Sequence, residues 1–142
     1  MNVYINEPFT VRRILAIQGK KEDLDILVDD SDWLVRKSVA AHGHKQHLDI
    51  LVHDFKSVVR RAVARHKHKE HLDILVRDEN RLTRLAVAKQ GHKEHLDILV
   101  HDEEFYVREY IAQNGNPEHL QILLKDKDIH IRDEALKQAG LS

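Results

Sequence analysis

The amino-acid sequence predicts an all-α fold, a right-handed α-solenoid (superhelix) built from short helix pairs. The first observation is a repeat: residues 44–54 return almost letter for letter as 68–78 and 92–102, and more loosely as 20–30 and 116–126. The second is that no insertion interrupts the 24-residue period. The third is composition, because 33% charged residues with five Gly and two Pro favour helices over turns and strands. Such a period is typical of stacked helical units.

Three columns of the repeat keep one residue type in nearly every copy. A leucine column comprises Leu24, Leu48, Leu72, Leu96 and Leu120. An aspartate column comprises Asp30, Asp54, Asp78, Asp102 and Asp126, and an arginine column comprises Arg12, Arg36, Arg60, Arg84, Arg108 and Arg132. One unit buries too few side chains to offset the ordering of its own chain. The columns therefore predict a core that neighbouring units share.

The first helix of each unit is predicted from one apolar stripe. Leu48, Leu51 and Val52 stand at positions i, i+3 and i+4, and Ile50 is expected to widen the stripe. In the last unit, Asn116 is followed by a proline, which is the pattern of an N-cap and a first helical residue. The helix therefore begins just before the stripe and ends near the aspartate column.

The second helix of each unit opens after Asp54 and carries Val59, Val63 and Ala64 on one side. We expect it to end at a left-handed glycine, at Gly19, Gly43, Gly91 and Gly115. Lys67 stands in this glycine column in one copy, and the same backbone angle there would cost roughly 1 kcal/mol.

The two ends of the chain are predicted to carry lone helices of the second type, at about 7–18 and about 127–138. This gives eleven helices with a half-repeat at the front. We expect a single domain over residues 1–142, made of an N-terminal half-repeat (1–19), a repeat array (20–126) and a C-terminal capping helix (127–142).

The unit Leu-x-x-Leu-Val-x-Asp-x-x-x-x-Val-Arg-x-x-Val-Ala, as at residues 48–64, resembles HEAT-like repeats. Its length is most similar to the 24-residue leucine-rich repeat variant subgroup, and the resemblance runs from about Val11 to Ala139. Thr83 replaces valine in one Val-Arg pair. The subgroup is known for a cysteine-ligated iron–sulfur cluster, which this cysteine-free sequence cannot hold. The resemblance implies a solenoid fold and leaves the function open, because such repeats serve many roles.

The Asp and Arg columns have two readings, an acid–base array or a structural ladder. The ladder is favoured, because Arg offers a fork of donors and Asp accepts both the fork and terminal backbone N–H groups. In HEAT-like repeats the matching residues look structural. Arg60→Ala or Asp78→Ala is expected to lower stability by ~1–3 kcal/mol. The ladder comprises Asp30, Arg36, Asp54, Arg60, Asp78, Arg84, Asp102, Arg108, Asp126 and Arg132.

The twelve histidines invite a metal or a pH-sensing interpretation. Ten of them lie between His42 and His101, in spacings such as His-x-His-x-x-His. Duplication explains their number, however, and copies one unit apart should lie roughly 10 Å from each other, too far to share an ion. His44 and His68 are expected to satisfy terminal backbone groups at the helix junctions. The sequence therefore predicts no metal site and no cofactor.

The columns that vary between copies point to a partner. The first, fifth and ninth positions of each second helix lie opposite the core positions and do not repeat. Aromatic and Arg side chains are the usual anchors of an interface, although drift or packing between helices would also explain the pattern. The candidate partner-binding residues are Trp33, Lys37, Arg61, Arg65, Arg81, Lys89, Phe105 and Glu109.

A nucleic-acid binder is the alternative. The central unit is basic through Lys56, Arg60, Arg61, Arg65, Lys67 and Lys69, with Arg81, Arg84 and Lys89 beyond it. Some alkylpurine DNA glycosylases resemble this solenoid build. Acidic residues are interleaved with these cations, which favours weak and salt-sensitive binding at most.

The sequence therefore predicts a non-catalytic binding scaffold for a protein or peptide. No nucleophile, paired-carboxylate site or phosphate loop stands out, so enzymatic activity is not expected. A cytoplasmic location is expected, with no membrane span, because no secretory signal and no long apolar run is present. The near-identical copies also allow self-association.

Overall fold

The structure is a computed structural model that describes residues 3–141. These residues form eleven helices and no strand. The helices divide into two compact units, one ending at His71 and one beginning at Leu72, so the boundary falls inside the sixth helix.

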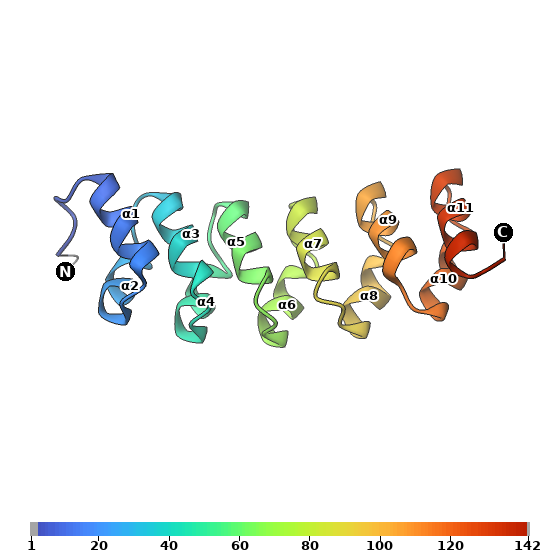
Figure 1. Ribbon diagram of the computed structural model, residues 1–142, viewed down its shortest axis with the longest axis horizontal. Coiled ribbons are helices and arrows are strands. Elements are labelled where there is room, and N and C mark those ends of the chain that lie inside the picture. The colour runs from blue at the N-terminus through green and yellow to red at the C-terminus, as the bar shows by residue number, and fades with distance from the viewer. Residues whose placement is uncertain (1–2, 142) are drawn as a thin grey trace. The chain divides into compact units, whose positions relative to one another are not determined.

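The first unit stacks helices in two layers. In Figure 1, α1, α3 and α5 lie side by side in one layer, and α2 and α4 lie in the other. The helices of this unit are α1 (Phe9–Gln18), α2 (Lys21–Leu27), α3 (Trp33–Ala41), α4 (Lys45–Leu51) and α5 (Ser57–Ala64), followed by the start of α6 (Lys69–Leu75).

The second unit repeats this arrangement after the end of α6. Within it, α7, α9 and α11 form one layer, and α8 and α10 pack beneath them (Figure 1). Its helices are α7 (Arg81–Ala88), α8 (Lys93–Leu99), α9 (Phe105–Asn114), α10 (Pro117–Leu123) and α11 (Ile129–Gln138). The predicted fold class, an all-α solenoid of short helix pairs, is confirmed.

The core consists of the repeating aliphatic columns. Leu48, Val59 and Val63 are completely buried, as are their counterparts in most other repeats. Each fully buried aliphatic side chain stabilises the fold by roughly 1.5–3 kcal/mol. Ile50 does not widen this core as expected, because half of it is exposed. It lies about 100° around the helix from Leu51 and so faces away from the stripe.

The helix starts use the caps that the sequence contains. The side chains of Asp32 and Asp128 each accept a hydrogen bond from the backbone N–H two residues later, at the starts of α3 and α11. Asn116 accepts one from the N–H of His119, as predicted for an N-cap before proline. The first and last helices begin two residues later than expected, because Pro8 and Asp128 occupy the cap positions.

The glycine column behaves in two ways. Gly19, Gly43 and Gly91 have φ of 75°, 75° and 77°, which is the left-handed conformation expected at a helix end. The expectation is wrong for Gly115, whose φ is −75°. Lys67 does not adopt the left-handed angle and so avoids its cost, because no non-glycine residue within 3–141 has a positive φ. A Cβ at Gly115 would lie 2.5 Å from the Ile111 carbonyl oxygen, so close backbone approach explains this glycine.

No helix within the described part of the chain is long and apolar enough to cross a lipid bilayer.

Candidate partner-binding surfaces

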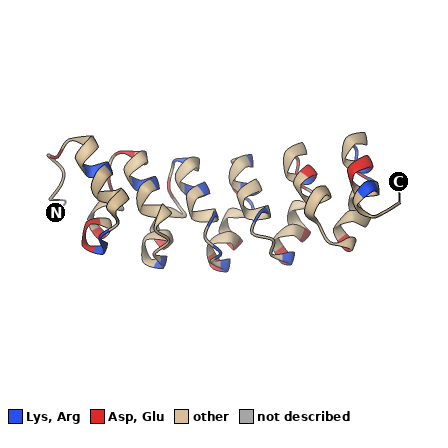
Figure 2. Cartoon of the chain, in the orientation of Figure 1, with Lys and Arg blue, Asp and Glu red and all other residues tan. Residues whose placement is uncertain are grey.

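The predicted variable stripe begins in the first unit as an aromatic and cationic surface. Trp33, Lys37 and Arg61 are half-buried and Arg65 is exposed. None of the three cations makes a hydrogen bond or an ion pair with residues 3–141. Helices α1, α3 and α5 contain no Asp or Glu, so Figure 2 colours their charged turns blue only. We call these four residues the basic stripe.

In the second unit the predicted variable stripe contains cationic, aromatic and acidic side chains. Arg81 is exposed and lies 3.3 Å from the Glu104 carboxylate, while Lys89 is exposed without such a partner. Phe105 and Glu109 are half-buried. The eight candidate residues are therefore all at least partly accessible, and the unpaired cations are concentrated in the first unit.

The Arg and Asp columns form a buried ladder. Arg36 donates from Nε to Oδ2 of Asp54 at 2.6 Å and from Nη2 to Oδ1 at 3.0 Å, and its Nη1 donates to the Asp30 carbonyl at 2.8 Å. The hydrogen bond to Asp54 raises the pKa of Arg36. The same fork joins Arg12 to Asp30, Arg84 to Asp102 and Arg108 to Asp126.

The remaining ladder residues make hydrogen bonds to the backbone of the turns between helices. Arg60 and Arg132 donate from Nη1 to the carbonyl oxygens of Asp54 and Asp126. Oδ1 of Asp78 accepts from the N–H of Asn80, which shapes the turn before α7. The guanidinium groups of Arg36, Arg84 and Arg108 are buried and forked onto aspartates of the next repeat, so they join repeats within each unit and offer little to a partner.

A second ladder, of His and Asp, was not predicted. The described residues contain four pairs in which a ring Nε2 lies 2.6–2.7 Å from an Asp Oδ1 one repeat earlier: His47–Asp25, His71–Asp49, His95–Asp73 and His119–Asp97. Nδ1 of all four rings is buried with no hydrogen-bond partner. Because one histidine column and one aspartate column recur with a constant offset, the sequence contains the signal for this ladder.

Ionised aspartates define the proton position in this ladder. Hydrogen bonds from Lys21 and then from His47 lower the pKa of Asp25 to about 2. A carboxylate only accepts hydrogen bonds, so Nε2 of His47 is the donor. Hydrogen bonds from His71 and Lys45 lower the pKa of Asp49 in the same way. Hydrogen bonds from Lys93 and His119 lower the pKa of Asp97.

A second set of histidines satisfies backbone groups. Nε2 of His42 lies 2.7 Å from the Ala16 carbonyl oxygen, and Nε2 of His66 lies 2.8 Å from that of Ala40. The expectation that His44 would do this is wrong, because its side chain makes no cap hydrogen bond and its ring packs edge-on against His47. His44 is the N-cap residue of α4 and stands three residues beyond the end of α3.

No group of three or more His, Asp or Glu within residues 3–141 is placed to hold a metal ion.

The surface where each first helix meets the next turn carries hollows that the sequence reasoning missed. Two lie in the second unit, with volumes of about 570 Å³ and about 420 Å³. Ten residues line each hollow, and every one of the first set has its counterpart 24 residues later in the second set. We call them the first cleft, which includes Ile98, and the second cleft, which includes Ile122.

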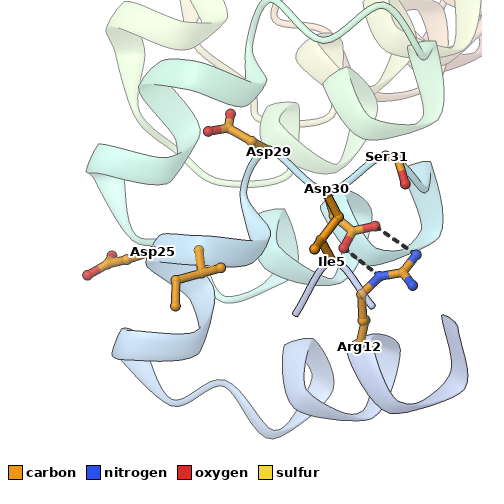
Figure 3. Close-up of a pocket in the computed structure, with 7 residues that line it drawn as sticks. Ile5, Arg12, Asp25, Asp29, Asp30 and Ser31 are labelled. Atoms are coloured by element: carbon orange, nitrogen blue, oxygen red, sulfur yellow. Dashed lines mark hydrogen bonds and ion pairs between the residues drawn. The ribbon is translucent and has the colours of Figure 1, made fainter. Parts of the chain in front are cut away.

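The first unit has a matching hollow of about 460 Å³ (Figure 3). Its lining includes Arg12, whose fork reaches Asp30, and Ile5 from the segment before α1. Asp25 points away from the forked pair in this view. Such hollows therefore occur in both units at the same place in the repeat.

One solved structure matches the fold over most of the chain. It is described as a leucine-rich repeat variant with a novel repetitive protein structural motif, with a TM-score of 0.72, 29% sequence identity and coverage of 94% of this chain. The match spans 55% of that structure, so the chain is about half as long as its structural neighbour. No protein-family model and no curated protein matches the sequence. The fold is thus similar to that of leucine-rich repeat variants and consistent with HEAT-like repeats.

Proposed function

We propose that the chain is a non-catalytic binding scaffold that presents the basic stripe to a protein or peptide partner. The observation that carries this proposal is the accessibility of Lys37, Arg61 and Arg65, three cations with no ion pair within 3–141, beside the half-buried ring of Trp33. Core columns repeat because packing requires it, whereas the stripe is free to vary.

The chemistry of the stripe favours an acidic segment of the partner. An aromatic side chain supplies rigid apolar contact, and Arg binds carboxylates through its planar fork. Because α1, α3 and α5 contain no carboxylate, an incoming acidic segment meets no repulsion from these helices.

The buried charged groups support a non-catalytic role. Arg36, Arg84 and their aspartates are engaged with one another, and the buried rings of His47 and His95 are held by aspartates of the preceding repeat. A general acid or base must reach a substrate proton, which these paired groups do not.

The nucleic-acid alternative draws on the same cations. Of the basic residues near the centre, Arg60 is buried in the ladder, and Lys69 has an interaction within the chain. Arg61, Arg65 and Lys67 could contact only a few phosphates, so duplex DNA is a competitor in the test below.

The experiment measures binding of fluorescent acidic peptides that contain one aromatic residue, using anisotropy at low salt. Trp33→Ala combined with Arg61→Glu should weaken binding about tenfold or more, because an interface anchor and a charge pair are lost together. Lys20→Glu is the control, since Lys20 is an exposed cation of the same unit outside the stripe.

Equal affinity of the double variant and the wild type would refute the proposal. Preferential binding of duplex DNA over the peptides, lost steeply as salt is added, would replace it with the nucleic-acid reading. Concentration-dependent self-association that is lost in the double variant would identify a second copy as the partner.

A further inference from the structure

The two clefts of the second unit form a repeated apolar surface with a varied rim. Leu99 and Ile98 line the first cleft, and Leu123 and Ile122 line the second at the equivalent positions. Ile122 is 41% exposed, so an aliphatic side chain is available to a ligand in the second cleft. The Arg–Asp forks at the back of both clefts are fixed by their own hydrogen bonds.

The rim is where the clefts differ. Arg77 and His101 occupy one rim column and Glu79 and Glu103 the other in the first cleft. The same two columns in the second cleft hold His101 with Lys125 and Glu103 with Lys127, because each rim pair is shared with the next repeat. Along the unit the rim therefore changes from one basic and two acidic side chains to two lysines and one acidic side chain, while the apolar lining stays constant.

The cations of the second cleft are free to bind. Lys125 and Lys127 are exposed and make no side-chain hydrogen bond or ion pair with residues 3–141. Glu103, by contrast, lies 3.8 Å from Nη2 of Arg84. The second cleft thus carries two unpaired lysines, whereas the first cleft carries one unpaired cation, Arg77.

We propose that these clefts bind an extended segment of a partner protein that carries aliphatic side chains three residues apart, with acidic residues beside one of them. Neighbouring repeats are separated by roughly 10 Å, the distance between packed helices. An extended chain in the polyproline II conformation has three residues per turn and rises about 3.1 Å per residue, so side chains at i and i+3 lie on the same side and reach adjacent clefts. The acidic residues pair with Lys125 and Lys127. This surface is distinct in its residues from the basic stripe.

Short peptides test the proposal on the full chain. The probes are fluorescein-labelled Leu-Ser-Ser-Leu-Glu-Glu and its reversed order Glu-Glu-Leu-Ser-Ser-Leu, because the direction of the bound segment is open. The control peptide Leu-Leu-Ser-Ser-Glu-Glu has the same composition with adjacent leucines. We expect one probe to bind at least about tenfold more tightly than the control peptide, since only one leucine of the control enters a cleft.

Variants locate the site. Lys125→Glu combined with Lys127→Glu should weaken the favoured probe about tenfold, as expected for two reversed surface pairs. Ile122→Ser should weaken it similarly while leaving the melting temperature close to that of the wild type. Lys89→Glu reverses the charge of one exposed lysine outside the clefts, which is half of the charge change in the double variant, and should have little effect.

Three outcomes would overturn the proposal: no binding of either probe at millimolar concentration, equal binding of the control peptide, or unchanged affinity in the lysine double variant. Weakening by Lys89→Glu equal to that by the double variant would also overturn it, because the effect would then be that of net charge. If Ile122→Ser fails to fold, the exposed lysines still decide the question. None of these outcomes bears on the basic stripe, whose Trp33 variant should bind the probes normally.

Discussion

Asp25 and His47, which stand in consecutive repeats, share a hydrogen bond between Oδ1 and Nε2 across 2.7 Å. The His47 side chain is 3% exposed, whereas that of Asp25 is 43% exposed. Each such pair therefore ties a buried ring of one repeat to an exposed carboxylate of the repeat before it. The bond makes packing between repeats depend on the charge of Asp25.

Acid should weaken this link in a defined pH window. The pKa of Asp25 is lowered to about 2 in the folded chain by Lys21 and His47, against an ordinary value of 3.8. A lowered pKa contributes stability that is complete above pH 3.8 and is lost as the pH falls toward about 2. Asp25→Asn should therefore show a shallower loss of unfolding free energy across this window, measured by urea titration followed by circular dichroism. Identical slopes for variant and wild type would contradict the assignment.

Loss of the Asp97 carboxylate at neutral pH should leave the buried ring of His119 without a hydrogen-bond acceptor. Asp97→Ala leaves Nε2 of His119, whose side chain is 1% exposed, without its partner at 2.7 Å. An unsatisfied buried donor costs about 1–3 kcal/mol. We expect the unfolding free energy of Asp97→Ala to fall by this amount.

Gln121 provides the matched control for this variant. It occupies the same column one repeat later, and its exposed side chain makes no hydrogen bond within 3–141. Gln121→Ala should change stability by no more than about 0.5 kcal/mol. Lys93→Ala separates the contribution of the Lys93–Asp97 ion pair, and equal losses in Asp97→Ala and Lys93→Ala would mean that His119 does not depend on the carboxylate.

The sequence predicts the fold well because identical columns meet identical surroundings in every repeat. Leu48 and Val59 could be assigned to the core from periodicity alone. The matching columns of His47 and Asp25 indicate a pairing, but the bond itself could not be assigned, because it depends on which way a ring turns between two helices. Ile50 was misplaced for a similar reason: an apolar residue beside the stripe is buried or exposed according to the neighbouring helix. The clefts escaped notice because a hollow is a property of packed surfaces and leaves no pattern in one segment.

Each arginine of the Arg–Asp ladder should contribute more to the unfolding free energy when it forks onto a carboxylate. Arg84 forks onto Asp102 and also donates to the Asp78 carbonyl. Arg132, in the same column, donates to the Asp126 carbonyl, and within residues 3–141 it has no carboxylate fork. Arg84→Ala should lower the unfolding free energy by ~1–3 kcal/mol, and Arg132→Ala by clearly less. Arg84→Lys should fall in between, because lysine cannot form the planar fork. Equal losses for the two alanine variants, measured by chemical denaturation, would count against the ladder.

His66 should make stability sensitive to mildly acidic pH. Burial lowers its pKa from the ordinary 6.5, the bond to the Ala40 carbonyl opposes this, and the charges of His68 and His71 add to the lowering. The folded state thus favours the neutral ring, so its stability contribution is complete above pH 6.5 and is lost as the pH falls through the folded value.

His66→Gln removes this titration and keeps a donor at the site. The difference in unfolding free energy between about pH 7.5 and about pH 5.5 should be smaller in the variant than in the wild type, while the remaining histidines act equally in both. An unchanged difference would show that His66 does not titrate in this window. Gln90 stands naturally in the same column, so glutamine is compatible with the backbone there.

Gly43 should be less replaceable than Gly91, although both are left-handed. A Cβ at Gly43 would lie 2.7 Å from Cε1 of His66, whereas a Cβ at Gly91 meets nothing within 4 Å. Gly91→Ala should cost about 1–2 kcal/mol for the backbone angle alone. Gly43→Ala should cost about 1 kcal/mol more, because the displaced ring loses its bond to the Ala40 carbonyl. Thermal denaturation of Gly43→Ala in a His66→Ala background isolates the cost of displacing the His66 ring. The extra loss of stability should vanish in that background. If it persists, the strain has another source.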